Sequence, residues 1–301
     1  MKILANDGIS DLGKSLLEAA GHIVSTDKVD QAALATAINE QNFDAVLVRS
    51  ATTVRKEVID ACPNLKLIGR GGVGMDNIDV AYAREKGLTV INTPASSSQS
   101  VAELVMGQLF SISRFLNNSF KEMDGGDFSA LKKAFAKGVE LRGKTLGIIG
   151  FGRIGQLVAH RMQAFGMDVV AYDPYLQPAR AAQLGVRLVE LDELLKVSDF
   201  ITIHLPKTKE TANLIGVEAL KKVKPTVRII NAARGGVLDE AALFDAITEG
   251  RVAGAGLDVF STEPCTDSPL FTLDQVVATP HLGASTDEAQ ERAGIAVAVS
   301  V

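Results

Sequence analysis

Short apolar runs alternate with amphipathic segments along the whole chain. In the first ninety residues, five such runs are separated by segments in which apolar residues recur at helical spacing. This alternation is typical of βαβ units, which build a parallel sheet. The predicted strands are KILAND, HIVST, AVLVRS, LKLIGR and LTVINTP, and the predicted helices are residues 12–20, 31–41, 53–61 and 80–86. This half of the chain predicts a small doubly wound domain.

A single long helix is predicted over residues 96–120, where apolar side chains occur nearly all round the helix. Ser97 and Ser98 stand at its start and suit an N-cap. Because a helix that is apolar on most of its surface is usually buried, we expect it to lie between domains or subunits. The polar stretch at residues 121–144 has no regular pattern and predicts a loop or an arm.

A second series of strands and helices begins at Lys144. Its predicted strands are residues 145–150, 168–173, 199–206, 228–233, 254–260 and 276–280. The last segment opens with Ser285 and Glu288 in the spacing of a capping box and continues as a helix to the end. The sequence therefore predicts an α/β fold with two doubly wound parallel-sheet domains.

Composition narrows the possible functions. The chain has 301 residues, more than one hydrophobic core usually holds, so two domains are expected. A net charge of −5 and the lack of Trp argue against a nucleic-acid partner. No apolar run approaches the ~20 residues that span a bilayer, and the N-terminus turns polar too early for a signal peptide. Cys62 and Cys265 lack metal-ligand spacing, so no metal is expected, and we interpret them as reduced thiols of a cytoplasmic protein.

A glycine-rich turn opens the second series. Gly150, Gly152 and Gly155 stand in the order G-x-G-x-x-G between an apolar strand and an amphipathic helix, and Asp173 ends the next strand. This is the full context of a dinucleotide site. The first glycine allows the tight turn, the second lets the backbone approach a pyrophosphate, and the third lets the helix pack on the strand.

The same turn predicts the kind of dinucleotide. The start of the following helix offers free N–H groups to the phosphates, in particular those of Arg153 and Ile154. The Arg153 side chain itself is equally well interpreted as solvated. Asp173 would accept hydrogen bonds from both ribose hydroxyls and repel a 2′-phosphate, so NAD is favoured over NADP.

Three polar residues follow apolar runs in the second half: Arg234, Glu263 and His281. Parallel strands would deliver all three to one edge of the sheet. A guanidinium pairs with a carboxylate, an imidazole can exchange a proton with a hydroxyl, and a neighbouring carboxylate orients the imidazole. The set predicts oxidation of a 2-hydroxy acid or reduction of a 2-oxo acid. The competing interpretations are a structural ion pair for Arg234, an ordinary loop acid for Glu263 and a structural histidine for His281.

These motifs together resemble a known family. GFGRIG with YDP, INAARGGVLDEAAL, GLDVF with EP, and PHLGASTDEAQ are similar to the D-isomer-specific 2-hydroxyacid dehydrogenases, most of all to their phosphoglycerate branch. VRSATTV and GRGGVGMDNID in the first half resemble the same family, and the similarity covers about residues 40–295. The resemblance implies a Rossmann NAD-binding domain, residues 96–284, inserted into a flavodoxin-like substrate-binding domain formed by residues 1–95 and 285–301.

The resemblance also implies roles for individual residues. The implied catalytic residues are Arg234, Glu263 and His281. The implied cofactor-binding residues are Gly150, Gly152, Arg153, Ile154, Gly155, Asp173, His204, Thr211, Ala232, Asp258 and Gly283. The implied substrate-binding residues are Arg49, Ser50, Gly72, Val73, Gly74 and Asn77, together with Arg234 and His281. Candidate cations for a substrate phosphate are Arg49, Arg70, Lys132 and Lys133, although the two lysines are as readily interpreted as a solvated pair.

The implied activity is NAD-dependent oxidation of D-3-phosphoglycerate to 3-phosphohydroxypyruvate, the first step of serine biosynthesis, in a homodimer or tetramer formed through the nucleotide-binding domain. Alternatives are another D-2-hydroxy acid such as glycerate, glyoxylate or lactate, an NAD-sensing corepressor, and a hydrolase of S-adenosylhomocysteine. Many members of the phosphoglycerate branch add C-terminal domains that sense serine. Because the sequence stops at Val301, we do not expect serine feedback.

Overall fold

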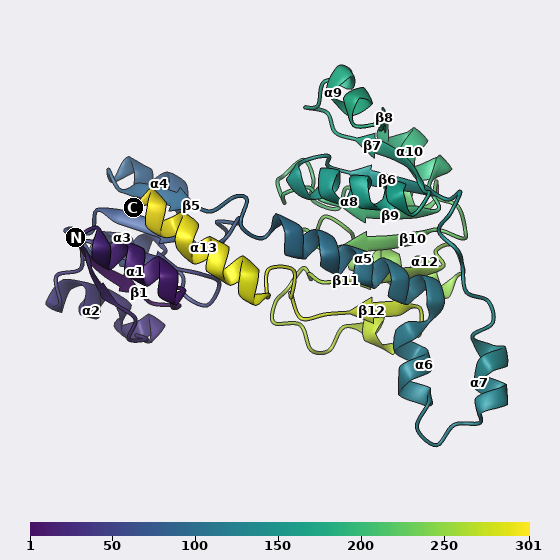
Figure 1. Cartoon of the computed structure of the whole chain (residues 1–301), viewed down its shortest axis with the longest axis horizontal. Coiled ribbons are helices and arrows are strands. Elements are labelled where there is room, and N and C mark those ends of the chain that lie inside the picture. The colour runs from purple at the N-terminus through teal and green to yellow at the C-terminus, as the bar shows by residue number, and fades with distance from the viewer. The chain divides into compact units, whose positions relative to one another are not determined.

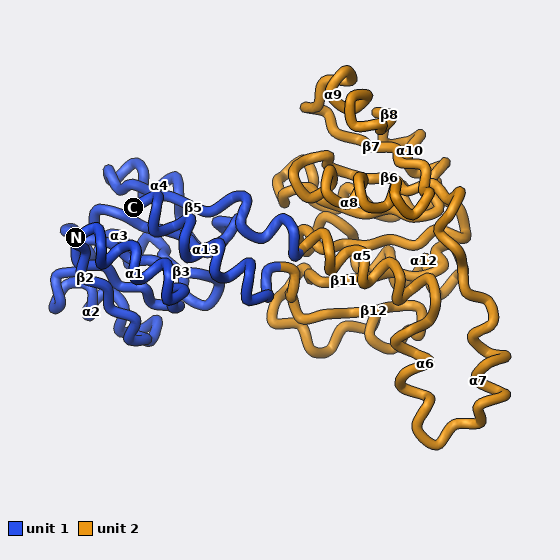
Figure 2. Tube along the Cα trace, viewed as in Figure 1, with its two compact units in different colours: residues 1–100, 284–301 blue, residues 101–283 orange.

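The computed structural model describes all 301 residues and divides into two compact units (Figure 2). Unit 1 comprises residues 1–100 and 284–301, and unit 2 comprises residues 101–283. Unit 2 is therefore inserted between two segments of unit 1, and both chain ends belong to unit 1 (Figure 1). Each unit contains one parallel sheet.

Unit 1 holds a five-stranded sheet in the order β2-β1-β3-β4-β5. Its strands are β1 (Lys2–Ala5), β2 (Ile23–Ser25), β3 (Ala45–Val48), β4 (Leu67–Arg70) and β5 (Thr89–Asn92). Its helices are α1 (Asp11–Ala19), η1 (Gln31–Ala33), α2 (Leu34–Glu40), α3 (Lys56–Ala61), α4 (Val80–Glu85) and α13 (Asp287–Ser300). This strand order is the flavodoxin-like form of a doubly wound sheet.

Successive side chains of the unit 1 strands enter cores on opposite faces of the sheet. Leu4 and Val46 pack in one cluster with residues of α2 and α3, whereas Ile3 and Leu47 pack in another with α1 and α13. This alternation follows from the two-residue period of a strand. Strands that are apolar on both faces need helices on both faces, as in Figure 1.

Unit 2 holds a seven-stranded sheet in the order β12-β11-β10-β9-β6-β7-β8. Its strands are β6 (Thr145–Ile149), β7 (Asp168–Tyr172), β8 (Arg187–Leu188), β9 (Phe200–Ile203), β10 (Arg228–Asn231), β11 (Gly254–Leu257) and β12 (Val276–Ala278). Its main helices are α8 (Arg153–Ala164), α9 (Pro178–Gln183), α10 (Leu191–Val197), α11 (Val217–Leu220) and α12 (Glu240–Thr248), with a short turn η2 (Pro269–Thr272). The sheet grows outward on both sides of β6, as in a Rossmann fold, so the predicted fold class is confirmed.

The long predicted helix is interrupted, and that prediction was wrong in its second half. Helix α5 (Ser98–Arg114) ends at Phe115, whose φ of 54° lies in the left-handed region, and α6 (Leu116–Glu122) follows. The ring centroids of Phe115 and Phe135 lie 5.9 Å apart, so the residue at the break packs against a residue within the polar stretch. No glycine or proline marks this break in the sequence.

The predicted loop or arm contains a further helix, α7 (Phe128–Ala134). It is capped by Asp127, whose carboxylate accepts the N–H groups of Ser129 and Ala130. We call residues 116–135 the arm, and Figure 1 shows α6 and α7 extending beyond the sheet of unit 2.

Two predicted helix starts were also wrong. Helix α13 is capped by Thr286, which accepts the N–H of Ala289, so Ser285 and Glu288 form no capping box. Helix α3 begins at Lys56 rather than at residue 53, because Val54 is buried and pairs with Ile78 in a parallel bridge.

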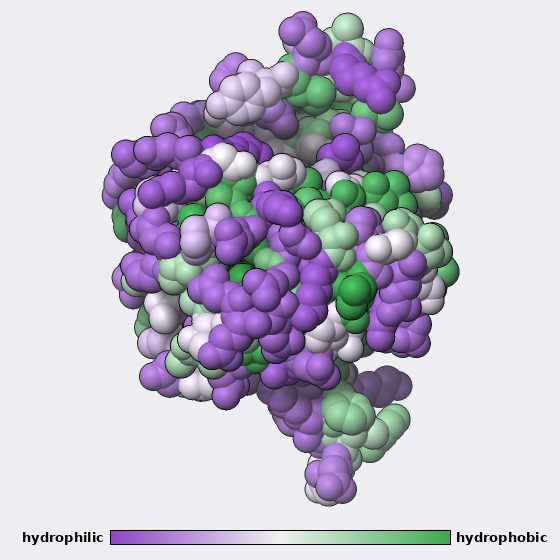
Figure 3. All heavy atoms as spheres, turned by 90° about the vertical axis from the view of Figure 1, so that its left-hand side faces the viewer, coloured by the Kyte–Doolittle hydropathy of each residue, from purple (hydrophilic) through white to green (hydrophobic).

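On the face drawn in Figure 3, hydrophilic side chains predominate and hydrophobic ones form small groups between them. No helix is both long enough and apolar enough to cross a bilayer.

Candidate active site

The carboxyl ends of β10, β11 and β12 lie next to one another along one side of the unit 2 sheet. The three strands are parallel neighbours. Arg234, Glu263 and His281 each lie a few residues beyond the carboxyl end of one of them, at the edge where ligands bind in doubly wound sheets.

His281 and Glu263 are in direct contact. The His281 Nδ1 lies 2.7 Å from a carboxylate oxygen of Glu263. Because an ionised carboxylate only accepts hydrogen bonds, the hydrogen in this bond sits on Nδ1. The other ring nitrogen, Nε2, therefore carries a lone pair when the imidazole is neutral. The His281 side chain is 48% exposed, so this nitrogen is within reach of a small molecule.

The orientation of Glu263 is fixed by the backbone before it. Its second carboxylate oxygen accepts the Phe260 N–H at 3.0 Å. Glu240, on the first turn of α12, holds the same loop by accepting both the N–H and the hydroxyl of Ser261 at 2.6 Å. The carboxylate therefore faces the imidazole in one arrangement, which is what orienting a catalytic base requires.

The loop of His281 is held by Asp258. One oxygen of this buried carboxylate accepts the Thr279 hydroxyl at 2.6 Å and the Leu282 N–H at 2.7 Å, and the other accepts the Gly283 N–H at 2.8 Å. His281 sits between these anchors with a φ of 54°. That conformation is uncommon for a residue with a side chain, and the three bonds to Asp258 hold the loop around it. Asp258 therefore has a structural role in addition to its implied role in cofactor binding.

The loop of Arg234 contacts the loop of Glu263. A side chain on Gly235 would clash with the carbonyl of Phe260, so the two backbones touch only because residue 235 is glycine. Asn231 shapes the turn, since its amide donates to the Arg234 carbonyl and accepts from the Ala233 N–H. The half-buried guanidinium of Arg234 donates to the Ala233 carbonyl at 2.7 Å.

The glycine turn fits a dinucleotide. Gly150 has a φ of 92°, and a β-carbon there would lie 2.9 Å from the His204 carbonyl. A β-carbon at Gly155 would lie 2.5 Å from the Gly150 oxygen, which confirms close packing of helix and strand. At Gly152, by contrast, no atom lies within 4 Å of that position, and α8 starts there without a side-chain cap. The N–H groups at the start of α8, where the sequence places Arg153 and Ile154, therefore have no side-chain cap.

Asp173 ends β7 beside this turn, where the sequence predicted it. One carboxylate oxygen accepts the Phe151 N–H and the other accepts the Tyr175 N–H, each at 2.9 Å. A carboxylate has about four acceptor positions, so ribose hydroxyls can still bind. Asp173 thus also supports the turn itself.

His204 follows β9 and packs against the glycine turn. Its Nε2 lies 3.0 Å from the Thr202 hydroxyl, whereas its Nδ1 is buried without a hydrogen-bond partner. Burial lowers the pKa of His204 to about 3, so the ring is neutral near pH 7. Thr211, in the loop that follows, donates to the Pro206 carbonyl at 2.7 Å. Ala232 is buried directly after β10.

The predicted substrate loops lie in unit 1, after β3 and β4. Arg49 follows β3, and its guanidinium donates to Gln290 at 3.1 Å. Gly72 to Gly74 follow β4, where Asn92 donates to the Val73 carbonyl at 2.8 Å. Ser50 is exposed, and Lys132 and Lys133 are exposed at the end of α7. These substrate and phosphate contacts stay predictions.

Sequence reasoning missed several residues that support the site. Glu240 and Asn231 touch no predicted ligand group, yet they hold the loops of Glu263 and Arg234. Gln108 of α5 donates to the Thr279 hydroxyl at 3.0 Å and so joins the Asp258 network. Asn231 could have been recognised from the sequence, because a buried polar residue at the end of an apolar strand needs a hydrogen-bond partner.

Comparison with known proteins identifies the family. Residues 106–283 match the NAD-binding domain of the D-isomer specific 2-hydroxyacid dehydrogenases. A D-3-phosphoglycerate dehydrogenase of Mycobacterium tuberculosis is 55% identical over 297 residues, which are 96% of this chain and 54% of that protein. A hydroxypyruvate reductase of Thermotoga maritima is 51% identical over 255 residues, covering 84% of this chain and 81% of that protein.

The fold agrees with these relatives. A crystal structure of a protein from Thermus thermophilus superposes with a TM-score of 0.88 at 32% identity, covering 99% of this chain and 94% of that one. The chain belongs to the D-isomer specific 2-hydroxyacid dehydrogenase family and carries its NAD-binding domain. It spans about half the length of the D-3-phosphoglycerate dehydrogenases that it matches.

Proposed function

We propose that the protein is an NAD-dependent D-2-hydroxyacid dehydrogenase that oxidises D-3-phosphoglycerate to 3-phosphohydroxypyruvate, the first step of serine biosynthesis. The observation that best supports this activity is the hydrogen bond between His281 and Glu263, at the edge of the unit 2 sheet where ligands bind in doubly wound folds. The choice of substrate is supported by relatives named D-3-phosphoglycerate dehydrogenase.

The residues around the glycine turn would hold the cofactor. The N–H groups at the start of α8 suit a pyrophosphate, and Asp173 suits the ribose hydroxyls. When bound, NAD⁺ supplies the hydride acceptor, C4 of its nicotinamide ring. The protein binds and orients this group, while the proton chemistry belongs to its own side chains.

The proposed reaction removes a proton and a hydride from the same carbinol. Arg234 pairs with the substrate carboxylate. With NAD⁺ bound as the hydride acceptor, the Nε2 of neutral His281 would take the hydroxyl proton, and Glu263 would stabilise the imidazolium that forms. The products would be the 2-oxo acid, the reduced cofactor and protonated His281, which would return its proton to solvent.

The substrate is tested by following NADH absorbance with a panel of acids. We expect D-3-phosphoglycerate to give the highest kcat/KM with NAD⁺, above D-glycerate and D-lactate. A higher value for D-glycerate would move the assignment toward hydroxypyruvate reduction, the activity named for the Thermotoga relative. No turnover of any 2-hydroxy acid would contradict the proposed class of reaction.

Asp173→Ala tests the choice of cofactor. Removing this carboxylate takes away the ribose contact and the repulsion of a 2′-phosphate. We expect a higher KM for NAD⁺ and a smaller preference for NAD⁺ over NADP⁺, by about tenfold if one charged hydrogen bond is lost. An unchanged cofactor preference would remove Asp173 from the cofactor site.

Assembly and location belong to the same proposal. The arm exposes Leu116, Phe120, Met123 and Phe128, which are 52–83% exposed in the isolated chain. Apolar side chains gathered on one extension support a homodimer or tetramer formed through unit 2. Analytical ultracentrifugation of Phe120→Ser should show dissociation. The control is Phe165→Ser, because Phe165 is an exposed residue of the same unit outside the arm.

Unpaired Cys62 and Cys265 support a cytoplasmic location.

A further inference from the structure

Three segments of unit 1 meet at the side chain of Asn77. Its Nδ2 donates to the Arg49 carbonyl at 2.9 Å and to the Thr52 carbonyl at 2.7 Å. Its Oδ1 accepts the Nε–H of Arg70 at 3.1 Å. Both donors and the acceptor of the amide are therefore engaged by protein groups, and they join the loop after β3 to the last residue of β4.

The backbone of Asn77 is fixed independently of its side chain. Its carbonyl accepts the Val54 N–H at 2.9 Å. The next residue, Ile78, is buried and forms the parallel bridge with Val54. A change in the side chain of residue 77 should therefore leave its backbone in place.

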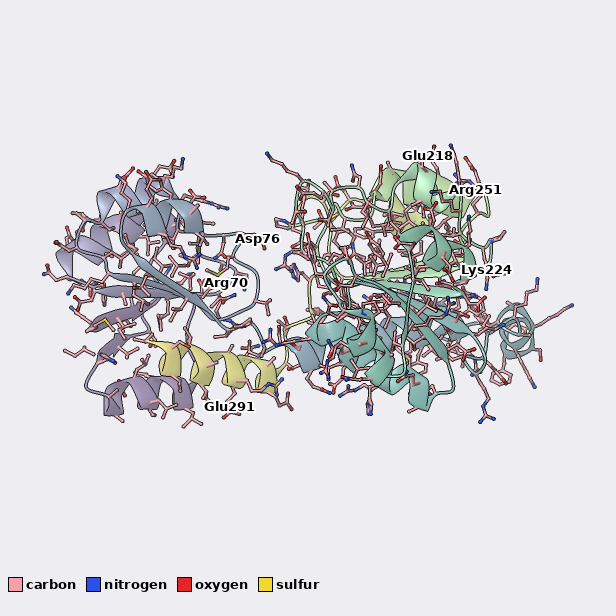
Figure 4. The ribbon with its side chains drawn as sticks, turned by 90° about the horizontal axis from the view of Figure 1, so that it is seen from above. Arg70, Asp76, Glu218, Lys224, Arg251 and Glu291 are labelled. Carbon is pink, nitrogen blue, oxygen red and sulfur yellow. The ribbon has the colours of Figure 1, made fainter.

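Arg70 is held from a second side by the glycine-rich loop. A side chain on Gly72 would clash with the Arg70 guanidinium, so this group lies directly over the Gly72 backbone. Figure 4 shows Arg70 at the end of β4 and Asp76 in the loop beyond it. The bond from Nε to Asn77 and the close approach of the terminal nitrogens to the Gly72 backbone therefore both help to place the guanidinium.

The Arg49 loop is held from its other side by Asp7. This carboxylate, whose side chain is 4% exposed, accepts the N–H groups of Arg49 at 2.6 Å and Thr52 at 3.0 Å. It also accepts the Thr52 hydroxyl at 2.6 Å. Asp7 thus fixes this segment to β1, and Asn77 fixes it to Arg70.

We propose that Asn77 is a positioning residue that keeps Arg70 and the Arg49–Thr52 segment in one arrangement for a small, multiply charged organic acid. The inference rests on the proposed function, which supplies that anion. Asn77 acts through its neighbours and does not itself touch the substrate. Because an arginine side chain loses rotamer entropy when it is ordered, holding it beforehand lowers the cost of binding.

Asn77→Ala tests the proposal through a split between kinetic parameters. We expect the KM for D-3-phosphoglycerate to rise by about tenfold, the effect of one hydrogen bond to a charged group, with little change in the KM for NAD⁺. Asn39→Ala is the matched control, because Asn39 also donates to a backbone carbonyl of unit 1, that of Ala61, in a different part of the unit. The control should leave both KM values unchanged.

A double-mutant cycle separates positioning from a general loss of structure. If Asn77 acts through Arg70, Asn77→Ala should raise the KM for the acid much less in an Arg70→Ala background than in the wild type. An equal rise in both backgrounds, or no rise in the wild type, would overturn the proposal.

Amide hydrogen exchange keeps the test independent of activity. In Asn77→Ala, residues 49–52 and 70–74 should exchange faster than in the wild type, whereas Asn39→Ala should leave them unchanged. Unaltered exchange would contradict the positioning role even in an active enzyme. A wild type that oxidises no 2-hydroxy acid would instead contradict the proposed function, while the exchange result would still decide whether Asn77 orders these loops.

Discussion

The two sheets of the protein have related topologies, but the turns that follow their first strands, β1 and β6, differ in the side-chain acceptors that they provide for backbone N–H groups. After β1 of unit 1, the buried carboxylate of Asp7 accepts the N–H groups of a neighbouring loop, and Ser10 caps helix α1 by accepting the Gly13 N–H. After β6 of unit 2, the turn contains no acid, and α8 begins at Gly152 without a side-chain cap.

The difference separates two effects: the sheet topology determines where backbone N–H groups gather, and the sequence of the turn determines which groups accept their hydrogen bonds. In both sheets, the first strand lies where the strand order reverses, and backbone N–H groups gather at its carboxyl end. Unit 1 satisfies such groups with its own carboxylate and hydroxyl. In unit 2, Asp173 accepts the Phe151 N–H, but the start of α8 has no side-chain cap and so suits a ligand anion. One fold pattern therefore yields a framework in one unit and a candidate cofactor site in the other.

The largest expected effect is in unit 2, at the group that moves the proton. His281→Ala removes the base while leaving its anchor Asp258 in place, and kcat should fall on the order of 100-fold or more. The affinity for NADH, measured by fluorescence titration, should stay near the wild-type value. Wild-type turnover in this variant would contradict the assignment of His281.

Making the unit 2 turn resemble that of unit 1 should close the cofactor site. Gly152→Asp places a carboxylate at the N-cap of α8, where a side chain meets no protein atom. Because the new charge faces the pyrophosphate, the KM for NAD⁺ should rise on the order of 100-fold, while thermal stability is kept or increased. A variant that binds NAD⁺ normally would show that the start of α8 is not the phosphate site.

Removing the internal anion of unit 1 should act on stability. Asp7→Asn weakens four hydrogen bonds, one of which is the ion pair with Lys28, and we expect a loss of about 2 kcal/mol in the free energy of unfolding. Denaturant unfolding near pH 7 measures it. An unchanged free energy of unfolding would contradict the framework role.

The difference in stability between the wild type and Asp7→Asn should depend on pH. Burial alone raises the pKa of the Asp7 carboxyl, but hydrogen bonds from Lys28, Thr52 and the Arg49 backbone outweigh it and lower the pKa below its usual value. The carboxylate therefore stabilises the fold above about pH 4, and this contribution is lost as the pH falls through the folded-state pKa. The wild type and Asp7→Asn should accordingly converge in stability as the pH falls below about 4.

The smallest effect is expected at the helix cap of unit 1. Ser10→Ala leaves the first turn of α1 without its side-chain acceptor and should cost about 1 kcal/mol of stability. Kinetic parameters should not change. A selective rise in the KM for NAD⁺ would mean that the cofactor depends on the unit 1 turn, against the comparison.

Much of the fold and the site could be predicted from the sequence, because the signals were local. Gly150, Gly152 and Gly155 indicate a turn that other residues cannot make, and apolar runs mark the strands on either side. Arg234 and His281 stood out since polar side chains at the ends of parallel strands reach one edge.

The remaining features depend on contacts between distant segments. The break at Phe115 is accompanied by packing against Phe135, and the start of α3 is set by the pairing of Val54 with Ile78. The resemblance implied that Asn77 binds substrate, and it gave no sign that the amide is engaged by groups brought together only in the folded sheet. Periodicity carries no information about such partners.

The central claim is that Glu263 and His281 work as one acid–base unit, and a double-mutant cycle in kcat tests it most directly. Glu263→Gln should lower kcat by about tenfold or more in the wild-type background, because the imidazolium loses its counter-charge, and should change it little once His281 is alanine. If Glu263→Gln lowers kcat by the same factor in both backgrounds, the two residues act separately and the account is contradicted.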